Sequence, residues 1–220
     1  MRRGLNGPRP TAAVRPYTAG LVTQRPVLGC LLEIVETLVL TLIIFFVIQS
    51  FVAQPYKVQQ QSMERTLEPE QYVLVDKLTP RFDTYKRGDI VVFTPPEEWG
   101  EGGTPFIKRV IGESGDTVDI RDDGLVYIND EVLEEPYVFA DAETGEPQPT
   151  TVAGDQASWT IPDGELFLMG DHRSNSADSR TFGPVEVDAV IGRAWLRYWP
   201  FDAFGVLSTP AYPEPTTSTP

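Results

Sequence analysis

Two hydrophobic patterns follow one another along the chain and change at Pro55. Before it, residues 37–53 carry no charge. Extending this run a few positions toward the N-terminus gives about 20 residues, roughly the length that an α-helix needs to cross a bilayer core. The run is longer than the apolar part of a cleaved secretion signal, and no small-residue A-x-A site follows it. We therefore expect residues 27–53 to form one transmembrane helix. A buried core helix is the alternative, because Gln49 and Ser50 interrupt the apolar run.

The first 26 residues have a different composition. They contain Arg2, Arg3, Arg15 and Arg25 with several prolines and glycines, and they show no apolar periodicity. We expect residues 1–26 to be a flexible basic tail. Arginines beside a transmembrane helix favour the cytoplasmic side. This predicts a single-pass protein of the plasma membrane, with a cytoplasmic N-terminus and an extracytoplasmic body.

After Pro55, short stretches of β-branched and aromatic residues alternate with Gly, Pro and Asp. This pattern predicts strands at residues 72–75, 89–93, 106–111, 117–120, 125–128, 166–169 and 190–198. Residues 121–124 (RDDG) have the composition of a tight hairpin turn, which joins antiparallel strands. The expected fold is therefore mostly β, an antiparallel-rich sheet domain over residues 54–207.

Two segments depart from the strand pattern. Residues 136–159 are polar and rich in Pro, Glu, Thr and Gly, so we expect an excursion from the core with its own short strands or loops. We refer to this segment as the excursion. Residues 208–220 cannot supply a core and are expected to be disordered.

Composition excludes several kinds of partner. The net charge of −14 argues against nucleic acid, because phosphate binding needs a basic face. Cys30 is the single cysteine, so one chain can build neither a disulfide framework nor a thiolate metal site. We expect no cofactor and no metal. With 220 residues, 41% of them hydrophobic, the chain can bury one main core.

A polar segment near the end of the chain carries residue types used in hydrolase chemistry. Residues 170–185, GDHRSNSADSRTFGPV, include the only histidine, His172, with three serines and two aspartates. A Ser-His-Asp triad, however, usually assembles residues from distant parts of a chain. Either this segment is the active site, or it supports chemistry located elsewhere.

A serine hydrolase that lacks a histidine base can use a lysine whose pKa is lowered by burial. Of the four lysines, only Lys108 lies in a strongly apolar stretch, FIKRVI at residues 106–111. Alternation along a strand places Lys108 and Arg109 on opposite faces, so one of the two cations must point toward a buried face. The alternative is an edge-strand lysine whose ammonium group stays in water. Composition does not choose among the serines; Ser62 follows soon after the apolar run and also suits a helix N-cap.

Four segments in order resemble those of the bacterial type I signal peptidases (leader peptidases), membrane-anchored serine proteases that remove signal peptides from exported proteins. Residues 62–67 (SMERTL) are similar to the nucleophile segment, usually S-M-x-P-T-L. Residues 72–77 (YVLVDK) and 87–93 (RGDIVVF) resemble the next conserved pair of strands. Residues 108–112 (KRVIG), followed by Gly115 and Asp116, resemble the segment that carries the general base, and residues 170–180 (GDHRSNSADSR) resemble the last box, GD[NH]RxNSxDSR.

The resemblance implies a serine endopeptidase that removes signal peptides, with Ser62 as nucleophile and a neutral Lys108 as general base. It also implies that the main-chain N–H of Ser62 is one donor of the oxyanion hole. The supporting residues that it implies are Ser176, which orients the lysine, the ion pair of Asp178 with Arg180, and the structural carboxylate Asp171. His172 is then a variant at an Asn/His position.

Two residues depart from the family pattern. Arg65 replaces the usual proline. Either this replacement loosens the turn after the nucleophile, or the arginine is tolerated at the surface of the turn. Gln60 stands where many members have Ser or Gly, and a Ser there completes the oxyanion hole. Either Gln60 offers an amide N–H instead, or the second donor is missing.

The resemblance also implies how substrate binds. An extended segment of a signal peptide would add as a strand beside residues 54–58 and place small side chains in two shallow apolar pockets. Tyr56, Val58, Gln60 and Met63 are the candidate substrate-binding residues, with plain strand core as the alternative for the apolar ones. The expected partners are signal peptides of exported preproteins and the lipid bilayer.

Two other functions compete with this interpretation. A self-cleaving repressor-type peptidase shares the Ser-Lys chemistry, but the apolar helix and the lack of a DNA-binding segment count against it. The second is a non-catalytic, membrane-anchored β domain that binds or organises secretion partners. Arg65 and Gln60 keep this second alternative open.

Overall fold

The structure is a computed structural model that describes residues 27–78, 82–99, 103–152 and 154–212. The chain divides into two compact units, residues 1–43 and 44–220. The predicted basic tail, residues 1–26, lies outside the described residues.

The apolar run forms one long helix, α1 (Val27–Phe51). Within it, Gly29–Gln49 has a mean hydropathy of 2.6 over its apolar window and none of that window is buried, which does not support the alternative of a core helix. The hydroxyls of Thr37 and Thr41 donate to main-chain carbonyls one turn earlier, so both polar groups are satisfied within the helix. The helix is long and apolar enough to cross a bilayer.

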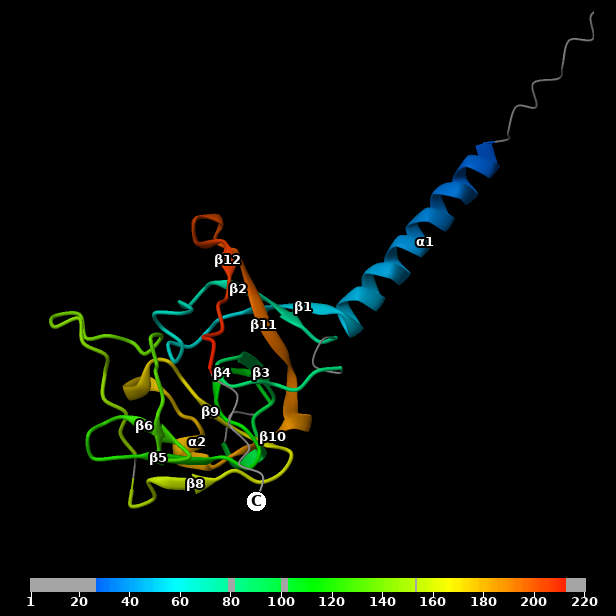
Figure 1. Cartoon of the computed structure of the whole chain (residues 1–220). Helices are drawn as coiled ribbons and strands as arrows, with labels where there is room; N and C mark the ends of the chain where they lie inside the picture. Colours follow the sequence, from blue (N-terminus) through cyan, green and yellow to red (C-terminus); the bar gives the residue numbers. More distant parts are fainter. Residues whose placement is uncertain (1–26, 79–81, 100–102, 153, 213–220) are drawn as a thin grey trace, which may run out of the picture. The chain divides into compact units, whose positions relative to one another are not determined.

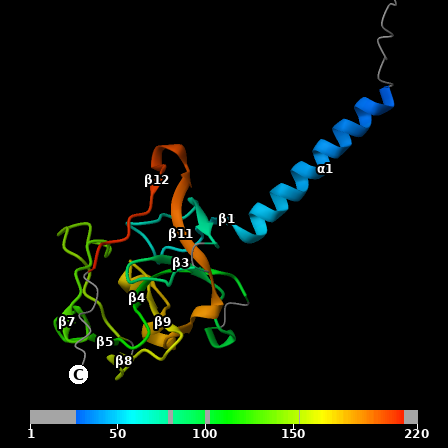
Figure 2. The same ribbon diagram turned by 45° about the vertical axis from the view of Figure 1, so that its right-hand side comes forward.

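The β body contains two antiparallel sheets in the described part of the chain (Figures 1 and 2). The larger has the order β1-β2-β11-β3-β4-β9-β10, with β12 paired to β11, and the smaller has the order β7-β6-β5-β8. The strands are β1 (Ala53–Lys57), β2 (Tyr72–Asp76), β3 (Ile90–Phe93), β4 (Phe106–Gly112), β5 (Thr117–Ile120), β6 (Val126–Ile128), β7 (Glu131–Val132), β8 (Ser158–Thr160), β9 (Glu165–Met169), β10 (Val185–Glu186), β11 (Val190–Trp199) and β12 (Gly205–Val206).

Short helical segments complete the described body. They are η2 (Glu97–Trp99), η3 (Arg173–Asn175), η4 (Val187–Ala189), η5 (Phe201–Ala203) and the single α-helical turn α2 (Ser179–Phe182). Both η3 and α2 lie in the polar segment that follows β9. That segment therefore folds as a compact bend and not as a strand.

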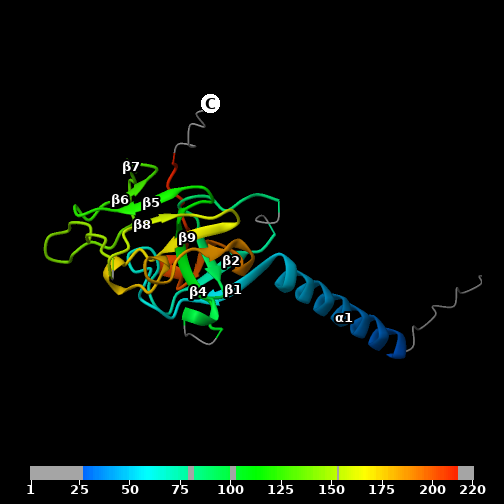
Figure 3. The same cartoon turned by 90° about the horizontal axis from the view of Figure 1, so that it is seen from below.

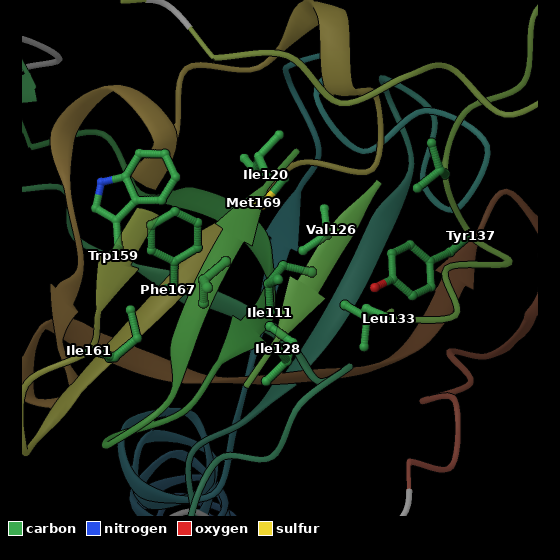
Figure 4. Close-up of a cluster of buried hydrophobic side chains, with 12 residues drawn as sticks. Ile111, Ile120, Val126, Ile128, Leu133, Tyr137, Trp159, Ile161, Phe167 and Met169 are labelled. Carbon is green, nitrogen blue, oxygen red and sulfur yellow. The ribbon is translucent and has the colours of Figure 1, made fainter. Parts of the chain in front are cut away.

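Three clusters of buried apolar side chains hold the body together. The first lies between β5, β6 and β8 of the small sheet and β4 and β9 of the large sheet, where Trp159 packs against Phe167 (Figures 3 and 4). The second covers another part of β4 and β9, and includes Phe93 and Phe106. The third packs the loop after β1 against β2, β3 and β11. β4 therefore has apolar neighbours on both faces.

The predicted fold class is confirmed, and each of the seven predicted strands is present within one or two residues of its expected bounds. The excursion carries a short strand at its end, because residues 158–159 belong to β8. One correction concerns its burial: Tyr137, Val138 and Thr150 of the excursion are buried. The excursion is thus polar in composition but does not leave the core along its whole length.

The expectation of a disordered tail does not hold for residues 208–212. The Thr209 hydroxyl donates to Asp89 at 3.3 Å, and the Tyr212 hydroxyl donates to the Glu134 carbonyl at 2.9 Å. These contacts attach the segment to the body. Residues 213–220 lie outside the described residues.

Candidate active site

The turn after β1 fixes the position of Ser62. Val58 and Glu70 close the base of the turn through two main-chain hydrogen bonds, from Val58 to Gln71 at 2.8 Å and from Glu70 to Val58 at 2.9 Å. Met63 and Leu67 are both 0% exposed and anchor the turn in the third cluster. Ser62, beside these anchors, is only 4% exposed. We call residues 58–71 the nucleophile turn.

Lys108 reaches Ser62 from the centre of the large sheet. It lies on β4, which is hydrogen-bonded to β3 on one side and to β9 on the other. Its Nζ lies 2.6 Å from Ser62 Oγ, although the two residues are 46 positions apart. The alternative of an edge-strand lysine with its ammonium group in water is therefore wrong, because Lys108 is only 1% exposed.

Burial changes the protonation of Lys108. Removal of the ammonium group from water lowers its pKa from 10.5 to about 8, an effect that Arg180 reinforces and that Asp178 and Asp171 oppose. The Phe106 ring, 5.4 Å from Nζ, forms part of the apolar surroundings. With that pKa, about a tenth of the lysine is neutral at pH 7, so a proton-accepting form is accessible.

The ion pair of Asp178 with Arg180 is buried near Ser62 and Lys108, which we call the dyad. Arg180 contacts both carboxylate oxygens, with Nε and Nη2 each at 2.8 Å. Asp178 also accepts from the main-chain N–H of Gly170 at 3.0 Å and caps α2. Burial would raise the pKa of Asp178, but the Arg180 hydrogen bonds and charge outweigh burial and lower it. Asp178 is thus an anion at neutral pH and one of the charges acting on Lys108.

Ser176 lies near the ion pair of Asp178 with Arg180 but does not make the hydrogen bond to Lys108 that the resemblance implies. Its Oγ is buried and has no hydrogen-bond partner among the described residues, so no hydrogen bond to Lys108 is present. Ser176 is still close enough to Asp178 to help lower the carboxyl pKa. A side chain added at Gly170 would meet Ser176 Oγ at 2.3 Å, so this glycine makes room for the serine.

Asp171 lies on the other side of the dyad lysine's strand and is 0% exposed. It accepts from Arg109 Nε at 2.8 Å and Nη2 at 2.6 Å, and from the Thr66 hydroxyl at 2.5 Å. The same guanidinium lies over the Tyr137 ring, 3.9 Å from its centre. Asp171 therefore connects β4 to the nucleophile turn.

His172 is not placed as a base for a serine in its own segment. Its Nδ1 lies 2.7 Å from Glu64 Oε2, and its ring stacks on Phe139. Its main-chain N–H donates to the Ser62 carbonyl at 3.0 Å. The neighbouring Ser174 donates to Gln148, and Ser179 accepts from the Leu168 N–H. The polar segment therefore surrounds the nucleophile turn without forming a triad of its own.

Two buried arginines were not recognised as site residues from the sequence. Arg109 was expected on the face opposite Lys108, with one of the two cations toward a buried face, yet both are 1% exposed. Arg173 is 2% exposed and donates to both carboxylate oxygens of Glu135, at 3.0 and 2.5 Å. The position of Arg173 inside the matched box was the one available signal, but no local pattern pairs it with Glu135.

A cleft of about 170 Å³, lined by both polar and apolar residues, lies beside the site, between β1 and the start of β4. Three of the four candidate substrate-binding residues, Tyr56, Val58 and Gln60, line it, and Ile107 lines it from β4. Met63 does not line it, because its side chain is 0% exposed in the third cluster. Among the described residues, no group of three or more His, Cys, Asp or Glu side chains has the arrangement of a metal site.

Comparison with known proteins identifies the family of this chain. A family model described as signal peptidase, peptidase S26, matches residues 31–199. The chain is 34% identical over 185 residues to the probable signal peptidase I-2 of Synechocystis sp., which covers 83% of this chain and 80% of that protein. It is also 34% identical over 173 residues to signal peptidase I T of Bacillus subtilis, with 78% of this chain and 86% of the relative covered.

One solved structure, a signal peptidase I from Enterococcus faecalis, is 34% identical and aligns with a TM-score of 0.40, covering 50% of this chain and 97% of that one. The family match extends from α1 to the end of β11 and includes Ser62, Lys108 and the polar segment after β9. This chain belongs to the signal peptidase family, peptidase S26.

Proposed function

We propose that this protein is a membrane-anchored serine endopeptidase that removes signal peptides from exported preproteins, with Ser62 as nucleophile and Lys108 as general base. The observation that carries the proposal is the buried contact of 2.6 Å between Lys108 Nζ and Ser62 Oγ. Family membership supports signal-peptide removal, and this contact supports the mechanism.

The dyad acts through one proton. In the neutral amine, Lys108 Nζ has a free lone pair and accepts the proton of Ser62 Oγ as the oxygen attacks the scissile carbonyl. The lysine then returns that proton to the leaving amine, which leaves an acyl-enzyme. In the second half, a water gives its proton to Lys108 and attacks the ester, and Ser62 recovers its hydroxyl hydrogen.

The negative oxygen of the tetrahedral intermediate needs donors. The main-chain N–H of Ser62 donates no hydrogen bond within the described part of the chain, which leaves it available for this role. Gln60 is exposed and lines the cleft, so its side-chain amide is a candidate second donor. One such donor is worth about 3–4 kcal/mol of transition-state stabilisation.

Substrate binding follows from the edge of the large sheet. β1 is an edge strand that pairs with β2, and its other side faces the cleft residues. An extended peptide can add to this edge through main-chain hydrogen bonds and place alternate side chains in the cleft. A cleft of about 170 Å³ suits small side chains. This supports cleavage after A-x-A-like sequences.

The energetics of Lys108 count against a non-catalytic β domain. Within the described residues, no carboxylate lies within ion-pair distance of Lys108, although the lysine is 1% exposed. A buried lysine without such a partner destabilises a fold, and an apolar residue would pack there at less cost. Retention of a destabilising group next to residues that line a cleft, here Phe106 and Ile107, is typical of catalytic sites.

The test is cleavage of a preprotein with an A-x-A site by the purified full-length wild type, Ser62→Ala and Lys108→Ala. We expect the wild type to cut at that site and each variant to lose about 10³-fold or more in kcat, as loss of a nucleophile or base does. Activity that survives in either variant would refute the dyad. An inactive wild type that still binds the preprotein would favour the non-catalytic alternative.

A further inference from the structure

The nucleophile turn is held by side chains that take no part in the dyad. We propose that Val138 and Phe139 of the excursion act with Glu64, Arg65 and His172 as a brace that positions Ser62 against Lys108. This inference rests on the proposed function, because it assigns these residues a role in the reaction of that same site. It also gives the excursion a function that its polar composition does not suggest.

The first contact of the brace comes from Arg65. Its backbone has a φ of +81°, a left-handed conformation that side chains other than glycine adopt at a cost. Proline, the usual family residue here, has φ fixed near about −65° and could not take this conformation. The Arg65 guanidinium donates to the carbonyl of Val138, which lies 73 positions away. At the position where the family usually has a proline, this chain thus has an arginine that makes a long-range hydrogen bond to the excursion.

The second contact comes from His172. Its ring stacks on Phe139 with centres 4.1 Å apart and an angle of 14° between the planes. Nδ1 contacts Glu64 at 2.7 Å, and the main-chain N–H donates to the carbonyl of Ser62 itself at 3.0 Å. Both partners of the side-chain pair are largely buried, with 13% and 16% of their side chains exposed. The histidine therefore connects the excursion to the two residues that flank Met63.

The excursion is itself fixed where it makes these contacts. The N–H of Phe139 donates to the carbonyl of Asp171 at 2.9 Å, and the N–H of Gln148 donates to the carbonyl of Phe139 at 2.9 Å. The side chain of Gln148 also accepts from Ser174 at 3.0 Å. Phe139 is thus held from both sides and offers a rigid surface to the histidine.

The dyad needs such a support because its two members differ in rigidity. Lys108 lies on an interior strand, whereas Ser62 lies on an irregular turn whose main-chain hydrogen bonds are made within the turn itself, apart from the one that the His172 N–H donates. A displacement of about 1 Å between reacting groups can cost up to about 10²-fold in rate. Contacts that limit motion of the turn should therefore act on kcat and leave substrate binding largely unchanged.

Arg65 offers a clean test. Arg65→Gly removes the guanidinium and accepts the positive φ without strain, whereas Arg65→Lys keeps a cationic donor. For a peptide with an A-x-A site, we expect Arg65→Gly to lower kcat about 5- to 20-fold with KM within about twofold, and Arg65→Lys to recover part of the loss. Arg121→Ala is the matched control, because its exposed guanidinium bonds Asp130 in the small sheet, away from the turn. It should keep the wild-type kcat.

The histidine arm is tested by a pair of substitutions. His172→Phe keeps a ring on Phe139 and removes the donor to Glu64, and His172→Asn keeps a donor and removes the ring. In a double-mutant cycle, Glu64→Ala should lower kcat in the wild type but have little further effect in His172→Phe. Additive losses would show that the two side chains act separately and would overturn the brace.

Hydrogen–deuterium exchange of the full-length protein separates this inference from the proposed function. Peptides that cover residues 62–67 should exchange faster in Arg65→Gly and His172→Phe than in the wild type or Arg121→Ala. Unchanged exchange, or faster exchange with unchanged kcat, would overturn the brace. If the wild type cleaves no preprotein, the proposed function fails while exchange still decides whether the brace holds the turn. If Arg65→Gly does not fold, His172→Phe carries both measurements.

Discussion

Lys108 is the residue for which the proposed function makes predictions of rate, pH dependence and stability. Its pKa of about 8 results mainly from burial, and the nearby charges act in opposite directions. Arg180 lowers the pKa further, whereas Asp178 and Asp171 raise it. A residue with this environment can act as a base near neutral pH without a histidine, as long as its neutral form is the one that reacts.

This assignment predicts a specific pH profile. Because the neutral amine accepts the proton, kcat/KM should rise about tenfold per pH unit below the pKa and level off above about 8. Initial rates on a peptide with an A-x-A site, measured between about pH 5.5 and 10, give the profile.

A change in the surrounding charges should move this profile in a known direction. Asp178→Asn removes a charge that raises the lysine pKa, so the rising limb should shift to lower pH. A profile that falls through pH 8, or one that Asp178→Asn shifts upward, would contradict a lysine base.

The same burial predicts a stability gain when the lysine is replaced. The pKa of Lys108 falls from 10.5 to about 8 on folding. The free-energy cost of burying the charged lysine is therefore complete below about pH 8 and disappears as the pH rises toward 10.5. Lys108→Met should therefore be inactive yet more stable than wild type at pH 7, by up to about 3 kcal/mol.

Denaturant unfolding of both proteins in the same detergent, followed by tryptophan fluorescence, measures the difference in the free energy of unfolding. The advantage of Lys108→Met should shrink when the pH is raised from 8 to 10. A variant that is less stable than wild type at pH 7 would show that the lysine is structural.

Strand β4 shows where pattern reading succeeds and where it stops. The apolar stretch predicted a strand at residues 106–111, and the structure has one at Phe106–Gly112. Alternation predicted that one of its two cations faces a buried side, but Lys108 and Arg109 are both 1% exposed. Alternation indicates two faces and not what covers them. Here the small sheet and the second cluster cover β4 from opposite sides, so both cations are buried and each contacts different residues.

The excursion illustrates the opposite failure. Its composition indicated a loop away from the core, and most of residues 140–148 are indeed exposed. Tyr137 and Val138, however, are 7% and 3% exposed, and they pack in the first cluster. Two apolar residues in a polar segment are too few to produce a periodic signal. Their contacts with Arg65 and Arg109 connect residues far apart in the sequence, and no local pattern contains that information.

At the level of the whole body, the long-range strand order creates the site. β11, from the end of the chain, lies between β2 and β3, so the sheet that carries Lys108 is complete only when residues 190–199 have been added. The sequence pattern predicted that these strands exist and that the sheet is antiparallel, but not their order. The pairing of Ser62 with Lys108 came from resemblance to a family, because their separation of 46 residues leaves no trace in spacing.

The arrangement of the protein across the membrane follows from the same combination of helix and body. α1 offers a predominantly apolar span of 21 residues, Gly29–Gln49, and the basic residues that precede it favour the cytoplasmic side. Signal peptides emerge on the opposite side of the membrane, where a body that follows α1 would meet them. We therefore predict that α1 resists alkaline extraction from membranes and that the β body is extracytoplasmic.

Protease added to spheroplasts that express the full-length chain tests this topology. It should degrade the β body and leave a small membrane-protected fragment that contains α1, whereas inverted vesicles should protect the body. An epitope tag inserted before Arg2 should behave in the opposite way: protease should cleave it in inverted vesicles and leave it intact in spheroplasts. If the body is protected in spheroplasts, the active site faces the cytoplasm, and removal of signal peptides after export is ruled out.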